Sequence, residues 1–196
     1  HLRSDRLHMQ PRDIRLLRET IQTRLVLGIT PTQEMLQVAY DIKPRQVVLI
    51  PEARDEFSLD QSLDIQAELE MVKKYARALC DAEIFASAFV AATIDQVKAA
   101  HRAELNGVVL DTGKLAQSKS QADIAQAIEN IDDAARAARK LGLRVAVSKG
   151  LTQHNIHHLK EIDAIDEVHI GQGLIHQALI VGLQEAVRHM CRAIQI

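Results

Sequence analysis

The segment VSKGLTQHNI (147–156) contains a lysine followed by a glycine, Lys149 and Gly150, between an apolar run and an amphipathic stretch. A lysine at the carboxyl end of a barrel strand could form a Schiff base with a carbonyl substrate. It could also bind a phosphate group together with Gly150 and the N-terminus of the helix that follows. The third interpretation is a solvent-exposed lysine in a tight turn, and the sequence leaves all three open.

The segment HIGQGLI (169–175) places Gly171 and Gly173 directly after another apolar run. Many barrel enzymes bind phosphate at this point, where backbone N–H groups precede a helix. We therefore expect a phosphate-binding loop here. The alternative is a tight turn that merely requires small residues.

Two other polar groups have less specific patterns. His154, His157 and His158 have the spacing of one helix face and could chelate a metal, but no acidic ligand accompanies them. We expect a solvent-facing cluster there and no metal site. Asp111, at the end of GVVLDT (107–112), could take part in acid–base chemistry or cap the turn that follows, and both interpretations remain open.

Short apolar runs alternate with longer amphipathic stretches along the whole chain. Lys149 and Asp111 lie at the ends of two of these runs, so the elements that the runs form must hold them in place. Each run is apolar at consecutive positions, as in strands that are covered on both faces. The expected strands are 24–30, 46–51, 84–90, 107–112, 143–148 and 167–171. The expected helices are 11–21, 31–42, 66–82, 93–104, 120–142, 152–162 and 174–194.

This alternation predicts one α/β domain over residues 1–196, because it favours parallel strands joined by helical crossovers. A (β/α)8 TIM-barrel type fits best, here incomplete with about six parallel strands and their helices. An open doubly wound sheet is the second possibility. With 47% hydrophobic but only 3% aromatic residues, the chain suits helices packed on a sheet rather than a β-sandwich.

Composition also limits the partners and the compartment. The net charge of −2 gives no electrostatic reason to expect nucleic acid or a membrane surface as a partner. Since the sequence has neither an apolar run of membrane-spanning length nor a signal-peptide pattern, we expect a cytoplasmic protein. Cys80 and Cys191 are far apart in helical patterns, which suggests two buried thiols in a reducing compartment.

Four long segments carry a resemblance to a known family: HLRSDRLHMQPRDIRLLRETIQTR (1–24), KPRQVVLIPEARDE (43–56), GLRVAVSKGLTQHNI (142–156) and HIGQGLIHQALIVGLQEAV (169–187). Together they resemble pyridoxine 5′-phosphate synthase, a barrel enzyme of vitamin B6 biosynthesis. The resemblance implies condensation of 1-deoxy-D-xylulose 5-phosphate with 3-amino-2-oxopropyl phosphate, without a metal or organic cofactor, in a homo-oligomer. It also implies that a strand, a helix and most of a second strand precede residue 1.

The resemblance assigns roles to individual residues. His1 matches the family's catalytic histidine, and Arg3 and His8 match residues that hold the deoxyxylulose phosphate. Ser58 stands where the family usually has threonine and keeps a hydroxyl donor. Two glycines match backbone positions that approach the second substrate and its phosphate, Gly150 and Gly171.

Other positions depart from the family pattern. Gly28 replaces one catalytic glutamate and Val109 replaces a second, so neither position can transfer a proton. Lys149 replaces a catalytic histidine, Gln172 replaces a phosphate-binding histidine, and Asp111 replaces a further histidine.

Three hypotheses follow from these matches and departures. The chain could be a working synthase whose altered residues are compensated elsewhere. It could be a catalytically degenerate relative that binds phosphorylated ligands or acts as a scaffold. A weaker possibility is a lysine-dependent, aldolase-type enzyme that uses Lys149.

Overall fold

The computed structural model describes residues 1–51 and 62–194. They contain one sheet of six parallel strands, which pair in sequence order from β1 to β6. The strands are β1 (Val26–Ile29), β2 (Gln46–Leu49), β3 (Phe85–Ala91), β4 (Gly107–Asp111), β5 (Arg144–Ser148) and β6 (Glu167–His169). Each expected strand is present, with ends that differ by a few residues. The sequential order confirms a barrel-type sheet rather than a doubly wound one, whose strand order would reverse.

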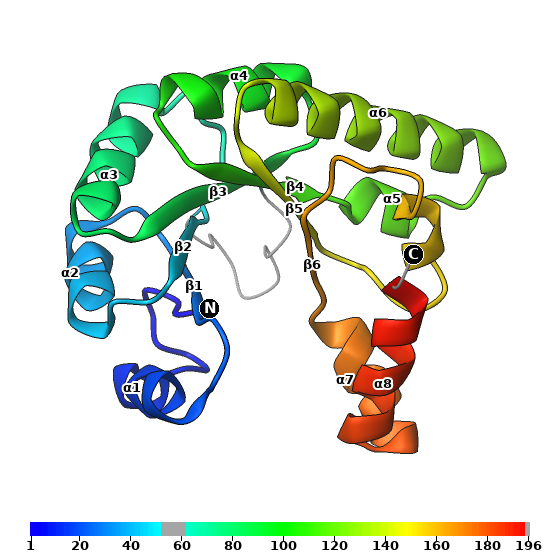
Figure 1. The fold of residues 1–196 in the computed structure, drawn as a ribbon, viewed down its shortest axis with the longest axis horizontal. Helices are drawn as coiled ribbons and strands as arrows, with labels where there is room; N and C mark the ends of the chain where they lie inside the picture. The colour runs from blue at the N-terminus through cyan, green and yellow to red at the C-terminus, as the bar shows by residue number, and fades with distance from the viewer. Residues whose placement is uncertain (52–61, 195–196) are drawn as a thin grey trace.

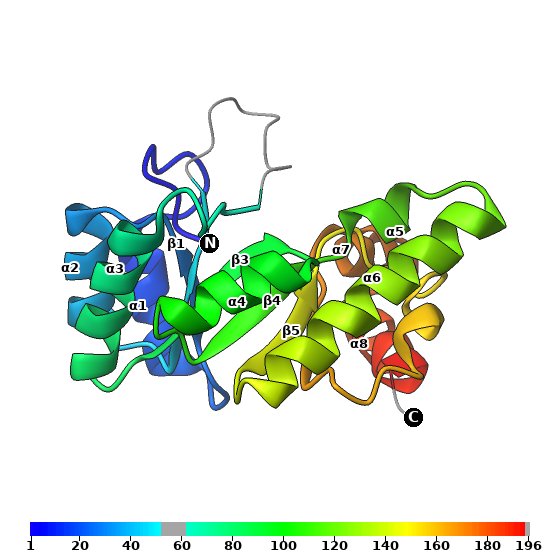
Figure 2. The ribbon, with the colours of Figure 1, turned by 90° about the horizontal axis from the view of Figure 1, so that it is seen from above.

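Eight α-helices and one 3₁₀ helix accompany the sheet within the described residues. They are α1 (Pro11–Thr20), α2 (Gln33–Ile42), α3 (Leu69–Asp81), α4 (Ile94–Arg102), α5 (Gly113–Gln117), α6 (Gln121–Lys140), α7 (Gln172–Val181) and α8 (Leu183–Ile194), with the short 3₁₀ helix η1 (Ile156–Leu159). Figure 1 shows the strands as an arch, with α2, α3, α4 and α6 on its convex side. Seen from above, α4 and α6 lie across β3, β4 and β5 (Figure 2). None of the helices within the described ranges combines the length and apolar character that crossing a membrane requires.

Local sequence explains where several helices begin. The side-chain oxygens of Thr32, Thr93 and Ser120 accept hydrogen bonds from backbone N–H groups in the first turns of α2, α4 and α6. Such caps satisfy donors that have no partner inside the helix. The caps therefore fix the points at which the chain leaves the carboxyl ends of the strands and turns back over the sheet.

The two faces of the sheet contribute to separate apolar clusters. On β2, the side chains of Val47 and Leu49 join the large core under the helices, whereas Val48 faces the concave side. There it packs with Val109 and Ala146 of the neighbouring strands. Because side chains alternate across a strand, every second residue of each strand faces the inside of the arch.

Two of the expected helices are different in the structure. Residues 152–162 form only η1, because Asn155 accepts a hydrogen bond from the N–H of Thr152 and donates one to the carbonyl of Gly150. These local bonds satisfy the backbone in a turn instead of a helix. The expected helix 174–194 is two helices, α7 and α8, separated at Gly182, whose φ of +83° ends α7.

Two more details of the sequence interpretation change. The expected turn after β4 contains the short helix α5. The expectation of two buried thiols is wrong for Cys191, which is exposed on α8, and Cys80 is half-buried. Cys191 is exposed because α8 buries only the opposite side of the helix, through Ala186 and Met190.

Candidate active site

A cavity of about 650 Å³ lies on the concave side of the sheet. It brings together four of the sequence-predicted site residues: His1, Gly28, Lys149 and Gly171. Much of the remaining wall is apolar, from Val26, Val48, Ile50, Pro51, Phe89, Val109 and Ile170. Barrel enzymes place their sites at the carboxyl ends of the strands, and the residues that follow β5 and β6 here line such a position.

Gly28 leaves space beside His1. A Cβ atom built on Gly28 would lie 3.7 Å from both the Cα and the Cβ of His1, an ordinary van der Waals distance. The backbone N–H of Leu2 donates a hydrogen bond to the carbonyl of Gly28, with a distance of 3.0 Å, and holds the first residues against β1. A side chain at position 28 would therefore fit next to His1, but the glycine supplies no functional group there.

Lys149 forms an ion pair with Asp111 at the ends of β5 and β4. Its Nζ lies 3.1 Å from Oδ2 of Asp111, and the two side chains are only 20% and 16% exposed. The other carboxylate oxygen, Oδ1, accepts a hydrogen bond from the N–H of Gly113 at 2.7 Å. Asp111 thus both caps the turn and pairs with the lysine. The ion pair holds the ammonium group in a defined position beside Asp111.

The backbone at Lys149 is strained. Its φ of +90° lies in a region that non-glycine residues rarely adopt. The hydroxyl of Thr112 lies 2.8 Å from the carbonyl oxygen of Ser148 and 2.6 Å from that of Lys149, so it is placed to donate to both. Strain of this kind persists where surrounding contacts enforce it, and it is concentrated at functional sites.

Gly150 and Gly173 have structural reasons to be glycine. Gly150 has a φ of +69°, and an added Cβ would lie 2.4 Å from the Cβ of Ala116 on α5. A Cβ on Gly173 would lie 2.4 Å from the carbonyl oxygen of Leu151, so this glycine allows α7 to start against the loop after β5. Gly171, in contrast, has open space around its Cβ position. It precedes α7, whose first turn has no side-chain cap.

Other residues singled out from the sequence lie elsewhere. Arg3 is buried and pairs with Asp5, at 2.6 Å, and His8 and Gln172 are exposed; the described wall of the cavity includes none of these three. Ser58 lies outside the described residues. The described ranges contain no group of three histidine, cysteine or acidic side chains that could hold a metal ion.

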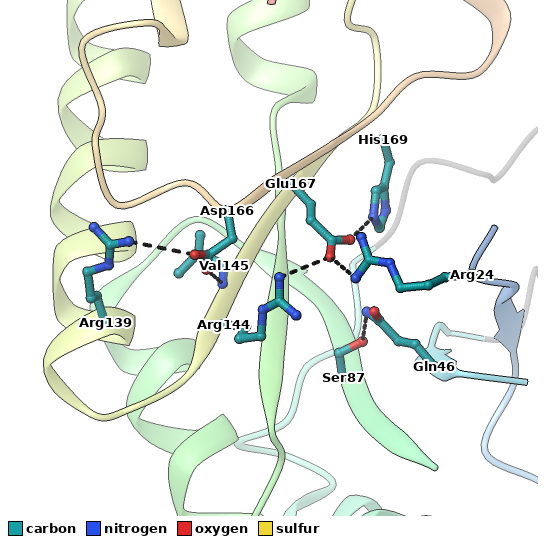
Figure 3. A network of polar contacts seen from close by, with 9 residues as sticks. All are labelled: Arg24, Gln46, Ser87, Arg139, Arg144, Val145, Asp166, Glu167 and His169. Atoms are coloured by element: carbon teal, nitrogen blue, oxygen red, sulfur yellow. Dashed lines mark hydrogen bonds and ion pairs between the residues drawn. The ribbon is translucent and has the colours of Figure 1, made fainter. Parts of the chain in front are cut away.

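Two residues of β6 were not singled out from the sequence, although both line the cavity. Glu167 and His169 lie two positions apart on one strand and therefore on one face of the sheet. Figure 3 shows Glu167 between Arg24, Arg144 and His169. Its Oε1 lies 2.7 Å from Arg24 and 3.3 Å from Arg144, and its Oε2 lies 3.5 Å from Nε2 of His169. The alternation in EVH was the signal that could have identified them.

This network controls the charge of Glu167. Burial raises the pKa of its carboxyl group, but the hydrogen bond and the charge of Arg24, the hydrogen bond of His169 and the charge of Arg144 together outweigh burial. The pKa of Glu167 is therefore lowered. The result is a carboxylate that stays ionised inside the arch at neutral pH.

Solved structures share this fold at low sequence identity. The KGPDC of Streptococcus mutans superimposes with a TM-score of 0.61 at 13% identity, covering 92% of this chain and 76% of that one. Phosphoribosylanthranilate isomerase from Thermotoga maritima gives a TM-score of 0.57 at 14% identity, covering 95% and 80%. At these identities the likeness supports the TIM-barrel type of fold and nothing more.

Sequence comparison is more specific. The pyridoxine 5′-phosphate synthase of Geotalea daltonii is 37% identical over 190 residues, which are 97% of this chain and 80% of that protein. The protein of the same name from Crocosphaera subtropica is 39% identical over 97% of this chain and 79% of its own length. The family model described as pyridoxal phosphate biosynthesis protein PdxJ matches residues 1–196. This chain therefore belongs to the PdxJ family, as its resemblance to pyridoxine 5′-phosphate synthase implied.

Proposed function

We propose that this chain carries out the reaction of its family, the condensation of 1-deoxy-D-xylulose 5-phosphate with 3-amino-2-oxopropyl phosphate. The observation that carries this proposal is the convergence of His1, Lys149 and Gly171 on one cavity. His1 supplies an imidazole that can transfer protons near neutral pH. Lys149 supplies a cation, and the open backbone at Gly171 supplies donors at the start of α7.

In this proposal Lys149 binds phosphate instead of forming a Schiff base. Its Nζ lies 3.1 Å from Oδ2 of Asp111, whereas a Schiff-base nucleophile must reach the carbonyl carbon of the substrate. Gly150 follows Lys149 and allows the turn to pack closely against Ala116 of α5. We extend the proposal to four further positions, which the resemblance assigns to substrate binding: Arg3, His8, Ser58 and Gln172.

A second function is favoured by a specific observation. Gly28 and Val109 lie on the cavity wall at the positions where the resemblance implies catalytic carboxylates, so neither position supplies such a group. The lack of carboxylates at these two positions supports a homologue that binds phosphorylated ligands, or acts as a scaffold, without turnover.

Product formation decides between the two. Purified protein, shown to be folded by circular dichroism, is mixed with both phosphorylated substrates, and pyridoxine 5′-phosphate is measured by chromatography with fluorescence detection. Steady turnover supports the synthase. Binding of the substrates without product supports the second function, and a folded protein that binds neither substrate refutes both.

The role of Lys149 has its own test. Lys149→Met should weaken binding of each phosphorylated substrate by about tenfold or more, which corresponds to ~1.4 kcal/mol for the loss of a charge-assisted hydrogen bond. Lys119→Met removes a lysine that is exposed and away from the cavity, and serves as the matched control. Isothermal titration calorimetry measures both. Equal affinities of the two variants would remove Lys149 from the phosphate site.

We also propose that the protein is a homo-oligomer, as the family resemblance implies, and that it works in the cytoplasm, where a biosynthetic family of this kind would act. Apolar side chains exposed on α7 and α8 support association: Ile175, Leu179, Ile180, Val181, Leu183 and Val187. Exposed apolar side chains gathered on two neighbouring helices are typical of protein interfaces. Analytical ultracentrifugation tests it, and a monomer at micromolar concentration would contradict it.

A further inference from the structure

The ionisable side chains of the cavity are few and unevenly placed. Within the described part of its wall they belong to His1, Lys149, Glu167 and His169. Lys149 is paired with Asp111 and serves as a cation in the proposed function. Gly28 and Val109 supply no ionisable group. Apart from His1, the acid–base groups of this wall are therefore a carboxylate and an imidazole that lie together on β6.

Strand geometry directs both groups into the arch. In β6, Val168 packs with the helix-side core. Ile170, just after the strand, packs against that core and also lines the cavity. The strand residues on either side of Val168, Glu167 and His169, line the cavity. Ser148 pairs with His169 in the parallel register of β5 and β6. The backbone of His169 therefore lies beside the residue that precedes Lys149.

Glu167 fixes one nitrogen of the imidazole. Its Oε2 lies 3.5 Å from Nε2 of His169, while its Oε1 lies between Arg24 and Arg144 (Figure 3). A carboxylate held in its charged form can only accept hydrogen bonds, so it selects the tautomer of His169 that carries its proton on Nε2. Nδ1 then has a free lone pair and can accept a proton from a substrate.

We propose that His169 is a proton-transfer residue of this cavity and that Glu167 is the positioning residue that fixes its tautomer. This inference rests on the proposed condensation.

The substrate amine attacks the ketone carbon of the other substrate, a C–N bond forms, and the π electrons of the carbonyl move to oxygen. His169 carries one proton from nitrogen to that oxygen and makes a hydroxyl group. In the second stage the C–O bond breaks and C=N forms. His169 then carries the second proton from nitrogen to the departing oxygen, which leaves as water.

The ion pair of Arg24 with Glu167 joins residues that are far apart in the sequence. Arg24 precedes β1 at one edge of the sheet, and Glu167 starts β6 at the other edge, 143 residues later in the sequence. Their ion pair crosses the open side of the arch. The charge that orients His169 therefore depends on the curl of the whole sheet.

The test compares His169→Asn with His101→Asn, which removes an exposed histidine on the outer helix α4. Wild-type protein and both variants are assayed with both phosphorylated substrates at saturation across the pH range. His169→Asn should lower kcat by about 10²–10⁴-fold, the usual contribution of one general acid–base group. It should also abolish one limb of the pH profile of kcat, because the proton-transfer group is gone. Glu167→Gln should lower kcat less and move that limb, and His101→Asn should change neither.

The outcomes separate this inference from the proposed function. If wild-type protein turns over and His169→Asn keeps its kcat and its pH profile, the inference is overturned and the function stands. If folded wild-type protein forms no product, both are overturned. If His169→Asn does not fold, nitrogen NMR of the wild-type imidazole decides: a proton on Nε2 supports the proposal, and a proton on Nδ1 overturns it.

Discussion

Replacing Gly150 by alanine should destabilise the turn after β5 through two separate effects. The first is the backbone: φ is +69°, and a left-handed conformation costs a residue with a Cβ ~1–2 kcal/mol. The second is packing, because the new Cβ would lie 2.4 Å from the Cβ of Ala116 and must displace α5 or the turn. Overpacking of this kind costs ~1–3 kcal/mol. The sum predicts that Gly150→Ala lowers the free energy of unfolding by ~2–5 kcal/mol.

Gly142 provides the matched control. Its φ is +78°, but nothing lies within 4 Å of its Cβ position. Gly142→Ala should therefore cost only the backbone part, ~1–2 kcal/mol. Both variants are unfolded in urea, followed by circular dichroism, and their free energies of unfolding are compared by linear extrapolation. The difference between them measures the packing effect.

A double-mutant cycle identifies the contact itself. In an Ala116→Gly background the opposing Cβ is gone, so Gly150→Ala should cost no more than Gly142→Ala does. Ala116→Gly alone should cost ~1 kcal/mol, the usual difference in helix propensity. Equal costs of Gly150→Ala with and without Ala116 would refute the close approach of the turn to α5. Equal costs of Gly150→Ala and Gly142→Ala in the wild-type background would do the same.

Two further predictions concern titrating groups. Because the pKa of Glu167 is lowered from its usual 4.5, its ionisation stabilises the folded state above that pH, and this contribution is lost as the pH falls through the lowered pKa. The urea stability of Glu167→Gln should therefore fall less between about pH 7 and about pH 3 than that of wild type, and parallel curves would contradict this. Cys191 is exposed, whereas burial raises the pKa of the Cys80 thiol despite its hydrogen bond to Asn106. An aromatic disulfide reagent should therefore label Cys191 quickly and Cys80 slowly, and equal rates would argue against the burial of Cys80.

The fold was largely predictable because it follows from local patterns. Continuous apolar runs and capping residues such as Thr32 and Thr93 repeat along the chain, and each acts over a few residues. Repetition of strand and helix then leaves few topologies. The errors occurred where local chemistry competes with periodicity: Asn155 satisfies the backbone in a turn, and Gly182 ends α7 in the middle of an apolar stretch.

The candidate site was predictable only in part. The ends of strands could be located from the sequence, so Lys149 and Gly171 were expected beside the same cavity, and the resemblance added His1 and Gly28. The same reasoning also placed Arg3 in the site, but Arg3 does not line this cavity and pairs instead with Asp5, two residues further along the chain. Spacing along a strand groups residues by face, as in EVH, but it does not show which of the two faces lines the cavity.

The sequence by itself determined the alternation of elements, the family of the chain and the absence of carboxylates at positions 28 and 109. Only the tertiary structure decided which charges meet. The pairs Lys149–Asp111 and Arg24–Glu167 join residues 38 and 143 positions apart. The physical reason is that an ion pair needs atoms within a few ångströms, and such distances depend on the register and curl of the sheet. The orientation of His169 follows from that same curl.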